Sequence, residues 1–121
     1  EAAVKNDPDE PLIRYALGQA QLSTEQPELT KTAIANLEQA VREDPDNPGA
    51  WYQLSVGYGR ENNLGMAHLA SAERAMLVGR PLDAKQQAER ALTRLARGSP
   101  AALRAEDIVS IAGTRIKDER R

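Results

Sequence analysis

The chain has 121 residues, no cysteine, and 16 basic against 18 acidic side chains, which gives a formal net charge of −2. This length is typical of one domain, and the balance of charges disfavours nucleic-acid binding, which usually requires a basic surface. No apolar run approaches the ~18 residues that a membrane span needs. Alanine is abundant and aromatic residues are scarce, a composition that favours closely packed helices over a sheet.

The beginning of the chain is repeated further along. Residues 1–11, EAAVKNDPDEP, match residues 38–48, EQAVREDPDNP, at seven of eleven positions with an offset of 37. Such a period resembles that of tetratricopeptide arrays, in which each unit of about 34 residues is a pair of antiparallel helices. We expect the extra residues in a turn at 23–28. Residues 1–8 would then end the second helix of a preceding unit, and we expect the chain, which begins at Glu1, to be an excerpt from a longer protein.

Apolar spacing and capping residues predict where the helices lie. Apolar residues three or four positions apart predict a helix over residues 33–41. Asn47 can cap the next helix and Ser99 the last one, each with a proline in the first turn that follows. Residues 66–78 are apolar almost all round, so we expect that helix to be covered on both sides.

The second unit carries the clearest family pattern. Residues 51–58 have the spacing Trp-x2-Leu-Ser-x2-Tyr, which resembles the first-helix signature of the tetratricopeptide unit, with serine in place of the usual glycine. We assign Trp51 and Tyr58 to packing inside the helix pair. In the preceding unit only the Leu-Gly pair at 17–18 is retained.

The sequence therefore predicts an all-α fold, a right-handed superhelix of tetratricopeptide-type helix pairs with a C-terminal capping helix. Each pair is too small to bury its own apolar face, so the pairs must stack, and the stack presents a concave groove for an extended or helical segment of a partner protein. Within the single domain, the predicted parts are the preceding helix at 1–8, the first repeat at 9–46, the second at 47–79, an overlapping third at 65–98 and the cap at 99–121.

The groove positions of the family come from the first helix of each unit. This mixture of aromatic, aliphatic and a few charged side chains suits apolar contact with a peptide that is supported by polar anchors. The alternative is that Tyr15 and Tyr52 only fill gaps between neighbouring helices. Carried onto this chain, the positions are Tyr15, Gln19 and Leu22 in the first unit, Tyr52, Val56 and Arg60 in the second, and Leu69, Glu73 and Met76 in the third.

Patterns that carry catalysis or bind metals are missing from the sequence. The one histidine, His68, is not part of a His-Glu-x-x-His motif, and we expect it to be a partly exposed helix residue. The glycines at 57 and 59 lack the Lys-Ser or Lys-Thr that follows a phosphate-binding loop. We therefore expect a non-catalytic chain with no metal or other cofactor of its own.

Two segments carry a closer resemblance. The first runs over residues 47–73 and contains Asn-Pro, the Trp-x2-Leu-Ser-x2-Tyr spacing and then Gly-Met-Ala at 65–67. The second has Gly-Ser-Pro at 98–100, followed by Leu-Arg-Ala-Glu-Asp-Ile at 103–108. Together they resemble the C-terminal tetratricopeptide-repeat (TPR) domain of BepA-like zinc metallopeptidases, which are periplasmic proteins of Gram-negative bacteria.

The resemblance implies a periplasmic location and a zinc peptidase domain ahead of residue 1, so that any zinc would be bound outside this chain. The tail would dock on outer-membrane assembly machinery or hold misfolded outer-membrane proteins for quality control. The alternative is an adaptor or assembly factor, such as a secretion or cytochrome c biogenesis scaffold, with no protease domain. We also expect self-association through the N-terminal end, where Ala3 and Val4 would be exposed.

Overall fold

The computed structural model describes residues 10–120, and this part of the chain is entirely helical apart from its turns. The predicted all-α class is confirmed. The helix predicted at residues 1–8, with Ala3 and Val4, lies outside the described residues. The helices are α2 (Glu10–Ser23), α3 (Pro27–Glu43), α4 (Pro48–Arg60), α5 (Leu64–Leu77), α6 (Pro81–Leu92) and α7 (Pro100–Glu119).

Prolines and capping side chains begin most of these helices. A proline stands in the first turn of α3, α4, α6 and α7, where its missing N–H removes no helical hydrogen bond. The Asn47 side chain accepts hydrogen bonds from the N–H groups of Gly49 and Ala50. Ser99 Oγ accepts one from the N–H of Ala102. Both caps predicted from the sequence are therefore present.

Short turns join the helices and reverse the chain. The turn between α2 and α3 falls inside the loop predicted at 23–28, and Glu25 there has a φ of 58°. Gly79 follows α5 with a φ of 74°, and Gly98 precedes α7 with a φ of 78°. Glycine adopts this left-handed backbone conformation without the steric cost that a Cβ atom imposes.

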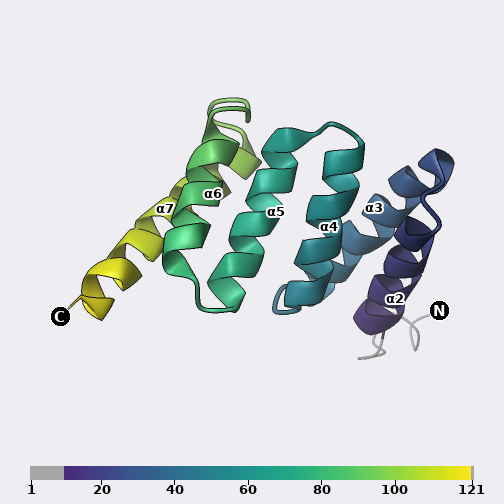
Figure 1. Ribbon diagram of the computed structural model, residues 1–121, viewed down its shortest axis with the longest axis horizontal. Coiled ribbons are helices and arrows are strands. Elements are labelled where there is room, and N and C mark those ends of the chain that lie inside the picture. Colours follow the sequence, from purple (N-terminus) through teal and green to yellow (C-terminus); the bar gives the residue numbers. More distant parts are fainter. Residues whose placement is uncertain (1–9, 121) are drawn as a thin grey trace.

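The helices pack one after another into an elongated array (Figure 1). Each of α2 to α6 packs against the helix that follows it. Some helices also contact the helix after next in the sequence: α2 contacts α4, and α5 contacts α7. The pair α2–α3 stands at one end of the array, and the pair α6–α7 stands at the other (Figure 1).

Two apolar clusters form the core, and α5 belongs to both. The first cluster lies among α2, α3 and α4 and contains the fully buried Leu37 and Leu54, together with Ala70 of α5. The second lies among α5, α6 and α7 and contains the fully buried Ile108, together with Ala72 of α5. Apolar neighbours thus cover α5 on two sides, as its lack of a polar face predicts.

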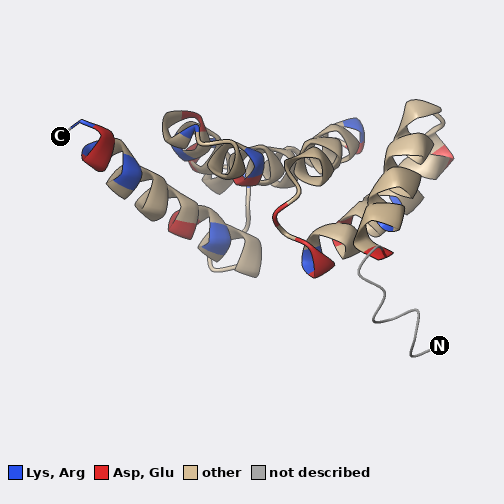
Figure 2. Ribbon diagram, turned by 90° about the horizontal axis from the view of Figure 1, so that it is seen from below, with Lys and Arg blue, Asp and Glu red and all other residues tan. Residues whose placement is uncertain are grey.

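The array is arched rather than flat. Seen from below, α4, α5 and α6 form one row, while α3 and α7 slope toward each other below this row (Figure 2). The C-terminal end of α3 and the N-terminal end of α7 face each other beneath the middle of the row (Figure 2). This arrangement leaves one side of α5 between two helices that come from distant parts of the chain.

Candidate binding groove

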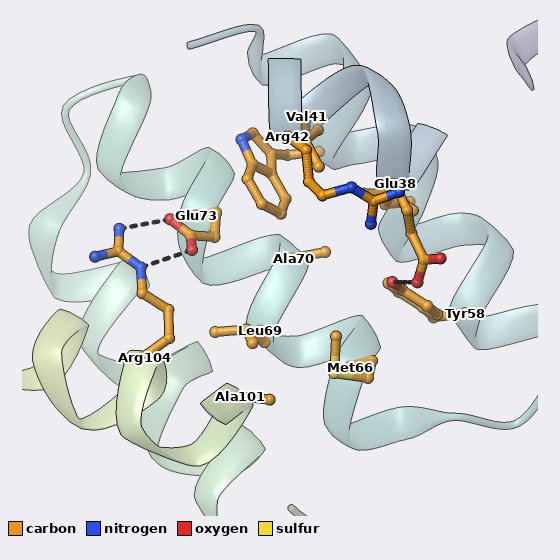
Figure 3. Close-up of a pocket in the computed structure, with 12 residues that line it drawn as sticks. Glu38, Val41, Arg42, Tyr58, Met66, Leu69, Ala70, Glu73, Ala101 and Arg104 are labelled. Atoms are coloured by element: carbon orange, nitrogen blue, oxygen red, sulfur yellow. Dashed lines mark hydrogen bonds and ion pairs between the residues drawn. The ribbon is translucent and has the colours of Figure 1, made fainter. Parts of the chain in front are cut away.

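A hollow of ≈ 350 Å³ lies between α3 and α7. Helix α5 provides its floor, α3 and α4 provide one wall, and the first turns of α7 provide the other (Figure 3). We call this surface the α3–α7 groove. Its lining residues are Glu38, Val41 and Arg42 of α3, Trp51, Leu54 and Tyr58 of α4, Met66, Leu69, Ala70 and Glu73 of α5, and Ala101 and Arg104 of α7.

The floor of the groove is apolar and fixed in place. Ala70 belongs to the first core cluster and Leu69 to the second, and both residues are buried. Met66 and Ala101 are only half-buried and leave apolar surface open to the groove. An apolar concave surface with charged groups at its edge is the usual anatomy of a site that binds a polypeptide segment.

Trp51 links the core to the groove. Its indole Nε1–H donates a hydrogen bond of 2.7 Å to the carbonyl of Pro45, which holds the ring in one orientation. The ring packs against the first core cluster, but it is only half-buried and also lines the groove. Tyr58, the other aromatic residue that the sequence assigns to packing, is buried.

A hydrogen bond from Tyr58 orients an acidic side chain at the edge of the groove. The Tyr58 hydroxyl donates to the carboxylate of Glu38 on α3 (Figure 3). Burial, and then this hydrogen bond and the charge of Glu38, raise the pKa of Tyr58 well above its usual value. Tyr58 therefore stays protonated at neutral pH and remains a donor to Glu38.

An ion pair connects the floor of the groove to the α7 wall. Arg104 donates from Nε and Nη2 to the two carboxylate oxygens of Glu73, at 2.7 and 2.8 Å (Figure 3). The hydrogen bond to Glu73 raises the pKa of Arg104 further, so the guanidinium is always charged. Both side chains are held with their charged groups facing each other, which leaves the apolar centre of the groove unobstructed.

The structure divides the groove residues predicted from the sequence between two faces of the array. Leu69 and Glu73 line the α3–α7 groove. Tyr15 packs against the first core cluster and Met76 against the second, which for Tyr15 is the gap-filling role left open by the sequence. The remaining five, Gln19, Leu22, Tyr52, Val56 and Arg60, meet in a separate depression between α2 and α4.

That second depression lies on the other side of α4. Tyr52 and Val56 are on a different side of α4 from Trp51, as expected from 3.6 residues per turn. Arg60 Nη1 there donates to the carbonyl of Leu22 at 2.6 Å, so it satisfies a backbone group near the end of α2. The guanidinium of Arg74 stands 5.4 Å from the centre of the Tyr52 ring, a cation–π contact. Two of the predicted groove side chains therefore have partners within the fold.

Sequence reasoning missed the residues that α3 and α7 contribute to the α3–α7 groove. The tetratricopeptide pattern places a groove on first helices only, so Arg42 on α3 and Ala101 and Arg104 on α7 were not predicted. A weak signal exists, because Glu38 and Arg42 are four positions apart and Ala101 and Arg104 are three apart, which places each pair on one helix face.

The described part of the chain offers no grouping of three or more histidine and acidic side chains that could hold a metal ion. His68 is half-buried, and its Nδ1 lies 2.9 Å from Oε1 of Gln87. Between residues 10 and 120, none of the helices is both long enough and apolar enough to cross a membrane.

Comparison of the chain with protein-family models, with curated proteins and with solved structures finds no match in any of the three.

Proposed function

We propose that the chain is a tetratricopeptide-type module that binds a segment of a partner polypeptide in the α3–α7 groove. In this proposal the helix pairs form a right-handed superhelix, and α7 caps its C-terminal end. The observation that carries the proposal is the apolar hollow of ≈ 350 Å³ between α3 and α7, which has α5 as its floor and charged side chains on both walls. The chain itself would be non-catalytic and would need no cofactor.

The groove offers a partner both apolar surface and polar anchors. Trp51 and Met66 are half-buried, so an apolar side chain of a partner would remove their remaining surface from water at about 25 cal/mol per Å². Arg42 is exposed at the edge of the α3 wall. It can donate to a carboxylate or to a backbone carbonyl of the bound segment.

Photo-crosslinking from two exposed positions would test which face binds. A photoreactive side chain at position 42 reports on the groove, and one at position 52 reports on the other side of α4. The probe is a displayed library of random peptides selected on the chain. We expect crosslinks from position 42, and their loss in Ala101→Glu, which places a carboxylate over the apolar floor. Crosslinks from position 52 alone would overturn the assignment of the groove.

We propose further, on the sequence motifs alone, that the chain is the docking tail of a periplasmic zinc metallopeptidase in outer-membrane protein quality control. The segments at 47–73 and 98–108 support this proposal. Its test is the coding sequence ahead of residue 1, where we expect a His-Glu-x-x-His motif. Absence of that motif would favour the adaptor or assembly factor, and the partner would then be sought among secretion or cytochrome c biogenesis proteins.

A further inference from the structure

One side of α2 is apolar and uncovered. Leu12, Ile13 and Leu17 are 53, 60 and 48% exposed, and Ala16 and Ala20 are exposed among them. Their spacing places all five on one side of the helix. Large apolar side chains gathered on one helix face usually mark a surface that contacts another protein segment.

The repeat in the sequence identifies what covers the equivalent face elsewhere in the chain. With the offset of 37, Ile13 corresponds to Ala50 and Leu17 corresponds to Leu54. Ala50 and Leu54 are each 1% exposed and belong to the first core cluster, with Leu37 of α3. On α4, the α2–α3 pair buries this face. On α2, the corresponding face is exposed.

A third position agrees with this correspondence. Ala20 corresponds to Gly57, and Gly57 lies so close to α3 that an added Cβ would stand 2.9 Å from Cγ1 of Ile34. The stripe on α2 thus includes a small residue at a position where α4 lies close to α3. Small residues at such positions let two helix backbones approach each other.

The sequence that leads into α2 also repeats the sequence that leads into α4. Residues 1–8 match residues 38–45, which contain the last turns of α3. In addition, the α3 surface that receives α4 is already occupied within this chain. A second copy of the chain therefore has no equivalent surface free to cover α2.

We infer that the exposed face of α2 is the docking surface for another helix pair of the same repeat type, supplied by the same polypeptide ahead of α2. This pair packs on Ile13, Leu17 and Ala20 as the α2–α3 pair packs on Ala50 and Leu54. The inference is independent of the α3–α7 groove, which lies in another part of the array.

The experiment compares the 121-residue chain with an extended chain in which a copy of residues 10–37 is joined ahead of residue 1. This junction keeps the repeat in register, because Glu1 takes the place that Glu38 has after Leu37. We expect a higher Tm for the extended chain. Leu17→Lys should change the Tm of the 121-residue chain little, but should lower that of the extended chain by more than about 5 °C. Leu103→Lys, at a 56% exposed position on α7, is the matched control with little effect in either chain.

Cysteine labelling gives a second measurement, since the chain has no cysteine of its own. A thiol reagent should modify Ile13→Cys about tenfold more slowly in the extended chain, because labelling then requires local opening. Leu103→Cys should react at the same rate in both chains. Equal effects of Leu17→Lys and equal labelling of Ile13→Cys in the two chains would overturn the inference. So would a 121-residue chain that dimerises and becomes monomeric with Leu17→Lys, since a second copy would then be the occupant.

Discussion

Arg104 on α7 donates two parallel hydrogen bonds to the carboxylate of Glu73 on α5, although the two residues are 31 positions apart in the chain. A bidentate arginine–carboxylate pair restricts both the distance and the relative orientation of its two groups. Because α7 forms one wall of the α3–α7 groove, this pair holds that wall against the floor. The stability of the last helix and the shape of the candidate site therefore depend on the same contact.

Substitution of Arg104 should lower the stability of the folded chain. We expect Arg104→Ala to lower the free energy of unfolding by about 1 kcal/mol, since the pair is bidentate but partly exposed to solvent. Arg104→Lys should recover less than half of this loss, because lysine lacks the planar fork. The control is Lys85→Ala, which removes a 3.8 Å pair with Glu89 and should cost about 0.3 kcal/mol. Urea unfolding followed by circular dichroism measures all three, and equal losses for Arg104→Ala and Lys85→Ala would contradict the prediction.

Fluorescence of Trp51 should report whether the groove is occupied. Trp51 is the one tryptophan of the chain and lines the groove with a half-buried ring. A bound peptide would exclude water from the ring, so we expect its emission to shift to shorter wavelength as the peptide is titrated. Ala101→Glu should abolish the shift, while Tyr52→Ala, on the other side of α4, should preserve it. A shift that survives Ala101→Glu but not Tyr52→Ala would place the peptide in the depression between α2 and α4.

The hydrogen bond from Tyr58 to Glu38 should make stability depend on alkaline pH. The pKa of Tyr58 is higher in the folded chain than in the unfolded chain, where it is about 10. The folded state then holds this proton more tightly, so the contribution is complete below pH ~10 and decreases as the pH rises above that value. We expect the Tm to fall above pH ~10 in the parent chain and less steeply in Tyr58→Phe. Tyr52→Phe, at an exposed position, should behave like the parent chain, and a parallel fall in Tyr58→Phe would disprove the link.

The helices could be predicted because local signals specify them. Asn47 and Ser99 each precede a proline, and both accept the hydrogen bonds expected of caps. The position of α5 between two clusters follows from residues 66–78, which are apolar almost all round. The turn at 23–28 also lies where the repeat offset requires additional residues. The caps and the apolar spacing depend on neighbours within a few positions in the sequence, and the turn follows from the repeat.

The α3–α7 groove could not be predicted in the same way. Helical spacing tells which residues of α4 share a face, but it does not tell which face the neighbouring helices leave open. Trp51 and Tyr52 are adjacent in sequence and lie on different sides of α4. The side of Trp51 is hollow because α3 and α7 slope toward each other beneath α5 (Figure 2). That slope depends on packing between different helices, such as the packing that buries Ala88 of α6 and Ile108 of α7 in the second cluster.

Two glycines inside helices should respond to alanine in opposite directions. At Gly18 on α2, an added Cβ would stand 2.6 Å from Cγ of Leu37 and 3.2 Å from the carbonyl oxygen of Ala33. Leu37 is fully buried and Ala33 contributes a backbone atom, so neither can move aside cheaply, and Gly18→Ala should cost about 2 kcal/mol. Gly59 on α4 has no heavy atom within 4 Å of the added Cβ, so Gly59→Ala should stabilise the helix by about 0.5–1 kcal/mol. Urea unfolding separates the two effects, and stabilisation by both substitutions would mean that α2 and α3 do not approach as closely as described.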